Sequence, residues 1–205
     1  FPVAANYAAE HDLIAAAVES HPDRFTGCMY WNPFDTEAGI RAELRRGVDM
    51  GLRALKLQPQ FSGLNPMSPR ASVFFGLANE FKLPVICHTG AGAPFALPSW
   101  FIAAAREYPS LTIVLGNCGS PIYFQEAINA AQVCPNIVLE VSSLIPHQVL
   151  DVLRHVDASR VMAGSDLPES AEYELGKVIG LDIAAEARRQ VLWSTGRRVF
   201  DGVVE

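Results

Sequence analysis

The sequence predicts an α/β fold, a (β/α)₈ TIM barrel that is incomplete at its N-terminus. Short runs rich in β-branched and aromatic residues recur along the chain, and segments with helical spacing lie between them. Successive runs start 23 to 32 residues apart, which is the repeat of a βα unit with right-handed crossovers. Three of the runs end on a polar residue, His88, Asn117 or Asp166. The carboxyl ends of barrel strands are where enzymes of this fold keep their chemistry.

Six strands are expected, bounded by Gly, Pro or Asn. They are predicted at 25–32, 52–57, 84–89, 112–117, 137–142 and 160–165. The intervening segments predict helices, because apolar residues recur on one face after Asp35 and again after Pro146. The chain is predicted to open with a helix at 4–20 and to close with an amphipathic helix in AAEARRQVLWSTGRRVF.

The length indicates one domain, 1–205, with about two βα units fewer than a full barrel. A closed eight-unit barrel typically needs about 250 residues, whereas this chain has 205 and starts with Phe1 rather than Met. We therefore expect the missing units at the N-terminus. A doubly wound open sheet ranks second, because no G-x-G-x-x-G or G-x-x-x-x-G-K motif occurs.

Composition excludes several classes of function. The chain is 50% hydrophobic and carries a net charge of −6, and its 16 Lys and Arg residues are scattered, so binding to nucleic acid is not expected. No apolar stretch reaches the roughly 18 residues of a spanning helix, so no membrane partner is expected either. The four cysteines form no C-x-x-C pair, which is typical of buried thiols in a reducing compartment. We expect a cytoplasmic protein.

Alternation along the strands predicts which side chains share a face. His88 is placed with Ile86, Asn117 with Ile113 and Leu115, and Asp166 with Met162 and Gly164. If this set lines the barrel interior, Cys87 and Cys118 point the other way and pack under helices.

Further polar residues interrupt apolar runs. Lys56 shares a strand face with Gln58, and Glu140 shares one with Ser142. Lys56 and Glu140 are candidates for substrate binding or, equally, for a structural ion pair, since a buried charge needs a partner. Trp100 follows His88 closely and is predicted either to line a pocket for a planar substrate or to be routine packing.

His88 and Asp166 together predict a metal site. An imidazole and a carboxylate at barrel strand ends are ligands for a hydrolytic Zn²⁺ or Mn²⁺ ion, which lowers the pKa of bound water to about 7. Zinc is the first expectation. Catalytic zinc usually has three protein ligands, and the other histidines lie on predicted helices or a helix-to-strand turn, so a complete site depends on further residues.

The chain resembles the amidohydrolase-related family of metal-dependent (β/α)₈ hydrolases and decarboxylases, which includes aminocarboxymuconate-semialdehyde and γ-resorcylate decarboxylases. The resemblance covers most of the chain. It rests on SHPDRFTG (20–27), GLRALKLQP (51–59), LPVICHTG (83–90), PSLTIVLGNCG (109–119), PNIVLEVSS (135–143) and SRVMAGSDLP (159–168). The resemblance implies that His88 is a metal ligand and that Asp166 is a ligand or a proton acceptor.

Two departures from the family pattern limit what the resemblance implies. The family has a His-x-His pair on its first strand, and this sequence contains none, so the metal is conditional on such a strand. The family usually has histidine where this chain has Asn117. An asparagine cannot exchange a proton near neutral pH, but its amide can donate a hydrogen bond to a developing oxyanion. Asn117 is therefore a candidate for orienting substrate or stabilising charge.

Ser120 and Pro121 have the pattern of an N-cap and first helical residue, which would direct a helix N-terminus at the site or simply start a helix.

The leading hypothesis is a metal-dependent hydrolase that acts on a small carbonyl or carboxylate compound. Decarboxylation is the alternative within the family, and it ranks slightly lower because Asn117 removes one proton carrier. A degenerate barrel that serves as a binding or assembly subunit is the alternative from another class. The resemblance implies a homo-oligomer.

Overall fold

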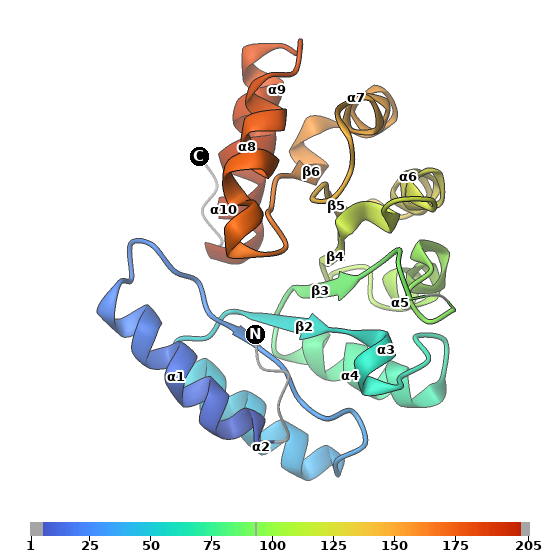
Figure 1. Ribbon diagram of the computed structural model, residues 1–205. Coiled ribbons are helices and arrows are strands. Elements are labelled where there is room, and N and C mark those ends of the chain that lie inside the picture. Colours follow the sequence, from blue (N-terminus) through green and yellow to red (C-terminus); the bar gives the residue numbers. More distant parts are fainter. Residues whose placement is uncertain (1–5, 93, 202–205) are drawn as a thin grey trace.

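A single six-stranded parallel sheet forms the centre of the molecule (Figure 1). The computed structural model describes residues 6–92 and 94–201. The strands are β1 (Cys28–Met29), β2 (Ala54–Leu57), β3 (Val85–His88), β4 (Ile113–Gly116), β5 (Ile137–Glu140) and β6 (Val161–Met162). They pair in chain order. All six predicted strands are confirmed, each shorter than its sequence pattern suggested.

Helices follow the strands in regular alternation. They are α1 (Tyr7–Ser20), α2 (Glu37–Asp49), α3 (Pro59–Ser62), α4 (Pro69–Glu80), α5 (Ile102–Glu107), α6 (Phe124–Val133), α7 (Pro146–His155), α8 (Ala171–Ile179), α9 (Ala185–Arg189) and α10 (Thr195–Asp201). Short turns are η1 (Pro98–Phe101), η2 (Asn117–Gly119), η3 (Ala158–Arg160), η4 (Pro168–Ser170) and the π-helical η5 (Gln190–Ser194). None of the helices in these two ranges combines the length and apolarity needed to cross a membrane.

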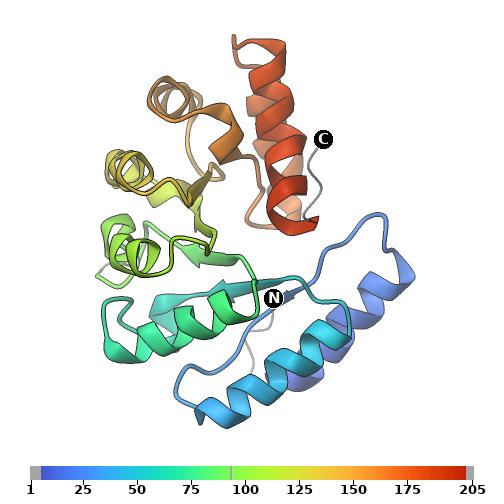
Figure 2. The ribbon, with the colours of Figure 1, turned by 180° about the vertical axis from the view of Figure 1, so that it is seen from behind.

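The sheet is curved, and its helices cover the outer side of the arc. Figures 1 and 2 show α4, α5, α6 and α7 outside the strands, α1 and α2 together at one end, and α8 to α10 at the other end. Within the described ranges β1 pairs only with β2, and β6 pairs only with β5. The architecture is an arc of a TIM barrel with six βα units.

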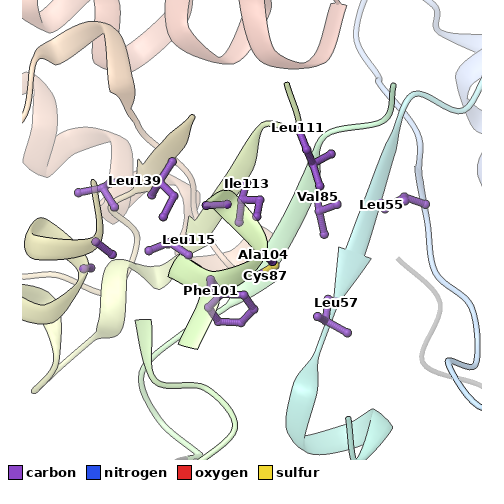
Figure 3. Close-up of a cluster of buried hydrophobic side chains, with 14 of the residues drawn as sticks. Leu55, Leu57, Val85, Cys87, Phe101, Ala104, Leu111, Ile113, Leu115 and Leu139 are labelled. Atoms are coloured by element: carbon purple, nitrogen blue, oxygen red, sulfur yellow. The ribbon is translucent and has the colours of Figure 1, made fainter. Parts of the chain in front are cut away.

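The two faces of the sheet bury different apolar sets. On the helix side, the main core contains residues such as Leu55, Val85, Cys87 and Leu115, together with Phe101 of η1 (Figure 3). The prediction that Cys87 and Cys118 pack under helices is confirmed, since both are fully buried in this core. The inner side carries a smaller cluster of Ile86, Val114, Val138 and Met162, against which Val199 and Phe200 of α10 pack.

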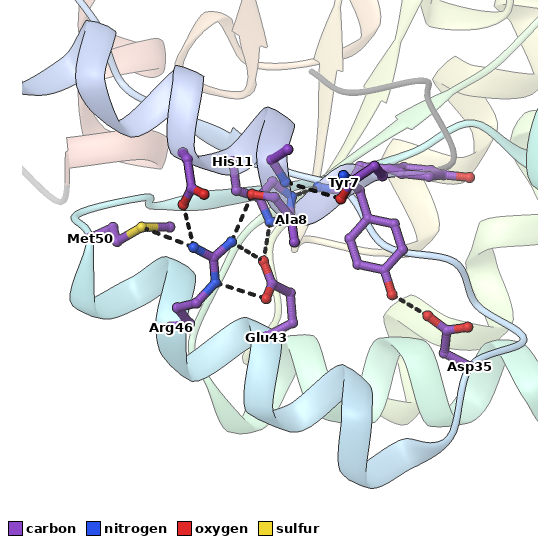
Figure 4. A network of polar contacts seen from close by, with 11 residues as sticks. Tyr7, Ala8, His11, Asp35, Glu43, Arg46 and Met50 are labelled. Atoms are coloured by element: carbon purple, nitrogen blue, oxygen red, sulfur yellow. Dashed lines mark hydrogen bonds and ion pairs between the residues drawn. The ribbon is translucent and has the colours of Figure 1, made fainter.

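A buried histidine ties the first two helices to the sheet. His11 of α1 is 1% exposed, and its Nδ1 atom lies 2.6 Å from Oε1 of Glu43 on α2. Its Nε2 atom accepts the backbone N–H of Tyr30 at 3.0 Å, so Nδ1 carries the proton. Arg46 contacts both carboxylate oxygens of Glu43 and also the carbonyl of Ala8 (Figure 4). His11 therefore has a structural role.

The C-terminal helix supports the edge of β6. The stretch predicted as one amphipathic helix is helical from α9 through η5 to α10. The carbonyl of Val191, in the π-helical turn, accepts the backbone N–H of Ala163 at 2.8 Å. This hydrogen bond satisfies a donor just beyond β6.

Candidate functional site at the carboxyl end of the sheet

His88 ends β3 on the inner side of the sheet. It pairs with Gly116 of β4, and alternation places it with Ile86, which belongs to the inner cluster, as predicted. The side chain is half-buried. Its Nδ1 atom lies 2.8 Å from Oδ1 of Asn117, and its Nε2 atom lies 2.8 Å from the carbonyl oxygen of Ala91.

Asn117 reaches His88 because the backbone turns sharply after β4. The alternation rule is wrong for this residue, since Ile113 and Leu115 face the helix-side core. Asn117 and Cys118 have φ values of 61° and 46°, in the left-handed region. This turn carries the Asn117 side chain back to the inner side, where it is 5% exposed.

A chain of hydrogen bonds fixes the orientation of the Asn117 amide. The Ser142 hydroxyl donates to Glu140 at 2.8 Å, so its oxygen accepts from Nδ2 of Asn117 at 3.0 Å. Oδ1 of Asn117 is then an acceptor, and His88 must donate to it through Nδ1. The four side chains connect the ends of β3, β4 and β5.

Glu140 anchors this chain. Its carboxylate accepts the backbone N–H groups of Asn117 and Ser142, each at 2.8 Å, in addition to the Ser142 hydroxyl. Burial raises the pKa of Glu140, and these donors and the Lys56 ammonium oppose the rise. Because three donors already occupy the carboxylate, its contacts are structural, and its predicted part in substrate binding stays a prediction.

Lys56 belongs to the same inner face. It precedes Leu57 at the end of β2 and is 8% exposed, and its charge acts on Glu140. The structure thus brings Lys56 into the electrostatic range of Glu140, and a part for Lys56 in substrate binding stays a prediction.

Asp166 follows β6 at the same end of the sheet, four residues after Met162. All the strands are parallel, so their carboxyl ends lie along one edge of the sheet, and Asp166 is at the same edge as His88 and Asn117. Asp166 has φ 60° and is exposed. Its carboxylate makes no hydrogen bond or ion pair with any residue that the structure describes. The hydrogen-bonded chain from His88 to Glu140 does not include it.

Trp100 lies in η1, after the loop that follows β3. It is half-buried and packs against Phe95, with ring centroids 6.0 Å apart. The sequence offered two roles for Trp100, and this contact is the routine packing. A contact between Trp100 and a substrate stays a prediction.

The predicted helix start at Ser120 is wrong. Helix α6 begins three residues after Pro121, at Phe124, with Tyr123 as its N-cap. The Ser120 hydroxyl donates instead to the carbonyl of Ser143 at 2.8 Å. The same Ser-Pro pattern at Ser68 does cap α4. The contact between Ser120 and Ser143 distinguishes the two serines.

The donor set fits part of a divalent metal site. A ligating histidine usually donates its other ring N–H to an oxygen, and Nδ1 of His88 does so to Asn117. Nε2 also faces an acceptor, the Ala91 carbonyl, at 2.8 Å, so it can bind a metal only once that carbonyl has moved away. Asp166 adds a carboxylate that makes no hydrogen bond or ion pair with the residues that the structure describes. Across residues 6–92 and 94–201, no three His, Cys, Asp or Glu side chains gather in a group suited to a metal. A complete centre therefore needs a ligand beyond this pair.

Sequence reasoning missed several residues that build the site. Thr89 is fully buried, and its hydroxyl joins the Gly116 carbonyl to the Gly119 N–H, at 2.8 Å each. Ser142 was noted only as a neighbour of Glu140 on one face, yet it links Glu140 to Asn117. Its position two residues after a buried strand carboxylate was the available signal.

Comparison with known proteins identifies the fold. An amidohydrolase family model matches residues 2–202, whereas none of the curated proteins gives a significant match. A solved structure of 5-carboxyvanillate decarboxylase from Sphingomonas paucimobilis is 18% identical, with a TM-score of 0.79, over 95% of this chain and 72% of that chain.

Two further solved structures have the same fold. The 2,6-dihydroxybenzoate decarboxylase from Rhizobium is 18% identical, with a TM-score of 0.73, over 95% of this chain and 76% of that chain. The dihydroxybenzoic acid decarboxylase from Polaromonas sp. JS666, with bound manganese and the inhibitor 2-nitroresorcinol, is 16% identical, with a TM-score of 0.74, over 95% and 74% of the two chains. The match of the family model along nearly the whole sequence shows that this chain belongs to the amidohydrolase family.

Proposed function

We propose that the chain forms the catalytic barrel of a metal-dependent decarboxylase that acts on a small carboxylated compound. One observation carries the proposal. The Nδ1 atom of His88 is held by an amide oxygen, and the Asp166 carboxylate, without a described partner, lies at the same end of the sheet. Membership of the amidohydrolase family and the similarity to decarboxylase structures support decarboxylation over hydrolysis.

His88 and Asp166 are the residues that would hold the metal, His88 through Nε2. Imidazole and carboxylate suit both zinc and manganese, and manganese is bound in the similar structure from Polaromonas. When bound, the metal would supply a Lewis acid that holds an anionic oxygen of the substrate. Nε2 now faces the Ala91 carbonyl at 2.8 Å, so this loop carbonyl has to withdraw before His88 can bind a metal.

Asp166 is proposed to move the proton. In decarboxylation the bond between the carboxyl carbon and the substrate carbon breaks, and carbon dioxide leaves. The electron pair that stays on the substrate carbon takes a proton from one oxygen of Asp166, while the other oxygen would be the one that holds the metal, and solvent then returns a proton to the first oxygen. A single proton carrier is sufficient for this reaction, so Asn117 in place of histidine does not exclude it.

Lys56 would act on substrate charge, and Asn117 would act through His88. The buried Lys56 ammonium on the inner face favours an anionic substrate. Asn117 acts mainly through His88, since both ends of its amide are engaged.

Hydrolysis of a small carbonyl compound is the second candidate, because the exposed Asp166 carboxylate can also accept a proton from water. The test uses the full chain loaded with Mn²⁺ or Zn²⁺. It compares carbon dioxide release from hydroxybenzoates with hydrolysis of the matching amides and lactones, with Glu169→Gln as the control for Asp166→Asn. Release of carbon dioxide that requires His88 and Asp166 supports the proposal. Binding of less than about 0.1 equivalent of metal, together with no turnover, would instead favour a non-catalytic subunit.

A further inference from the structure

An ion pair is buried behind the site, on α8. Lys177 and Glu174 lie one helical turn apart, and their side chains are only 3% and 7% exposed. The Lys177 ammonium donates to the carbonyls of Val141 and Leu144, at 3.0 and 2.6 Å, and to the Glu174 carboxylate. Three donors thus meet three acceptors, and the ammonium is saturated.

The pair holds the loop at 141–144, which follows β5. Lys177 binds the carbonyls at both ends of this loop, and Oε1 of Glu174 accepts the N–H of Ser143 in its middle, at 3.1 Å. Ser143 has φ 64°, a conformation that needs support from its surroundings. The loop is therefore fixed to α8 at three points.

The same loop presents Ser142 to the site. The Ser142 hydroxyl accepts from the Asn117 amide, which in turn accepts from Nδ1 of His88. A displacement of the loop would move the Ser142 oxygen and release the Asn117 amide. The contacts thus run without a gap from the buried ion pair to the imidazole.

Stability alone does not explain these two charges. Apolar residues of similar volume commonly replace a buried ion pair without loss of stability. Apolar side chains, however, cannot set the positions of two carbonyls and one N–H group. We propose that Lys177 and Glu174 are positioning residues that hold the loop at 141–144 and thereby fix the Ser142–Asn117–His88 hydrogen bonds. A hydrogen-exchange test of this inference is independent of the proposed function, and only a kinetic test rests on it.

The test compares hydrogen exchange at two imidazole N–H groups in the full chain. The double variant Glu174→Gln/Lys177→Met keeps an acceptor for Ser143 and an apolar stem, but it loses the donors to the two carbonyls. NMR measures the exchange of the His88 Nδ1–H proton, with the His11 Nδ1–H proton as the internal reference on the far side of the molecule. Glu186→Gln/Arg189→Met removes an exposed pair with the same i, i+3 spacing and is the matched control.

We expect His88 Nδ1–H exchange at least about tenfold faster in the double variant, with His11 unchanged and the control like wild type. Unchanged exchange at His88, or an equal increase at both histidines, would overturn the inference. If the double variant does not fold, Glu174→Leu/Lys177→Met is measured in its place, with the same criteria.

Kinetics separate this inference from the proposed function. In the metal-loaded protein, the double variant should lower kcat about tenfold and leave KM within about twofold. A wild-type protein that turns over no carboxylate would refute the proposed function, while the exchange result would still decide the positioning role.

Discussion

The Nδ1 atom of His88 and the Oδ1 atom of Asn117 lie 2.8 Å apart and join the ends of β3 and β4. The contact gives Asn117 a definite role at a position where the family usually has histidine. An asparagine oxygen can hold the proton of the neighbouring imidazole, so that the second ring nitrogen can bind a ligand once the Ala91 carbonyl has moved away. We therefore propose that Asn117 is a positioning residue.

Removal of the Asn117 amide should weaken metal binding. In Asn117→Ala the His88 ring loses its acceptor, so the affinity for Mn²⁺ or Zn²⁺ should fall about 10- to 100-fold. Isothermal titration of the full chain measures this change. Asn129→Ala, on the exposed side of α6, is the control and should bind metal like wild type. Equal affinities for Asn117→Ala and wild type would contradict the assigned role.

Replacing Asp166 by asparagine should abolish turnover without loss of the fold. Asparagine tolerates the left-handed backbone at φ 60°, so Asp166→Asn removes the proton carrier and the anionic metal ligand without straining the backbone. The turnover number should fall at least about 100-fold, with an unchanged melting temperature. Glu169→Gln, three residues away and exposed, should retain activity. Near-normal turnover by Asp166→Asn would remove Asp166 from the mechanism.

Replacing Glu140 by glutamine should destabilise the protein. The carboxylate accepts three hydrogen bonds, and the amide NH₂ group of glutamine would face N–H or O–H donors. We expect a loss of about 1 to 3 kcal/mol in the free energy of unfolding, measured in urea. The exposed Glu172 gives the matched control, Glu172→Gln, which should change stability little. A variant as stable as wild type would show that this carboxylate anchors nothing.

Replacement by alanine should change the stability of the protein in opposite directions at two glycines. A Cβ at Gly164 would lie 2.4 Å from Oε1 of Glu140, whereas a Cβ at Gly176 on α8 would meet nothing within 4 Å. Gly164→Ala should therefore lower both thermal stability and metal affinity. Gly176→Ala should raise stability by about 0.5 to 1 kcal/mol, because alanine is the better helix former. Equal effects would refute the close packing of Gly164 against Glu140.

The ion pair between Glu43 and Arg46 on α2 should make stability depend on acid. Arg46 holds the pKa of Glu43 below its ordinary value of 4.5. A lowered folded-state pKa gives stabilisation that is complete above pH 4.5 and is lost as the pH falls through the folded value. Glu43→Gln should lose about 1 to 2 kcal/mol at neutral pH and show a flatter acid dependence.

The control for that titration is Glu19→Gln on the exposed side of α1. Its urea unfolding curves between pH 3 and 7 should follow those of wild type. An unchanged acid dependence in Glu43→Gln would mean that this carboxylate adds no stability to the fold.

Much of the fold and part of the site could be predicted from periodicity. The run ending at His88 alternates regularly, so His88 could be placed beside Ile86 on the inner face. The same rule failed at Asn117, because the left-handed turn at Asn117 and Cys118 reverses the side-chain direction. Asn117 belongs to a residue type that tolerates the left-handed region, but neither position is a glycine, so the sequence signal for this turn is weak.

Other features depend on contacts that no local pattern encodes. Glu174 and Lys177 have the spacing of an ordinary surface ion pair, and their burial and their contacts with the loop at 141–144 appear only in the folded structure. Ser120 has the pattern of a helix cap, but its hydroxyl donates to the carbonyl of Ser143 in the next βα loop. In each case tertiary contacts decide the role of a polar side chain.

The most direct test of the account is where a metal ion binds. Crystals of the full chain with Mn²⁺ would be examined by anomalous diffraction. We predict one ion bound both by Nε2 of His88, at about 2.0 to 2.3 Å, and by the Asp166 carboxylate, with the Ala91 carbonyl displaced. An ion bound elsewhere, or a separation between His88 and Asp166 too large for one ion to contact both, would contradict it.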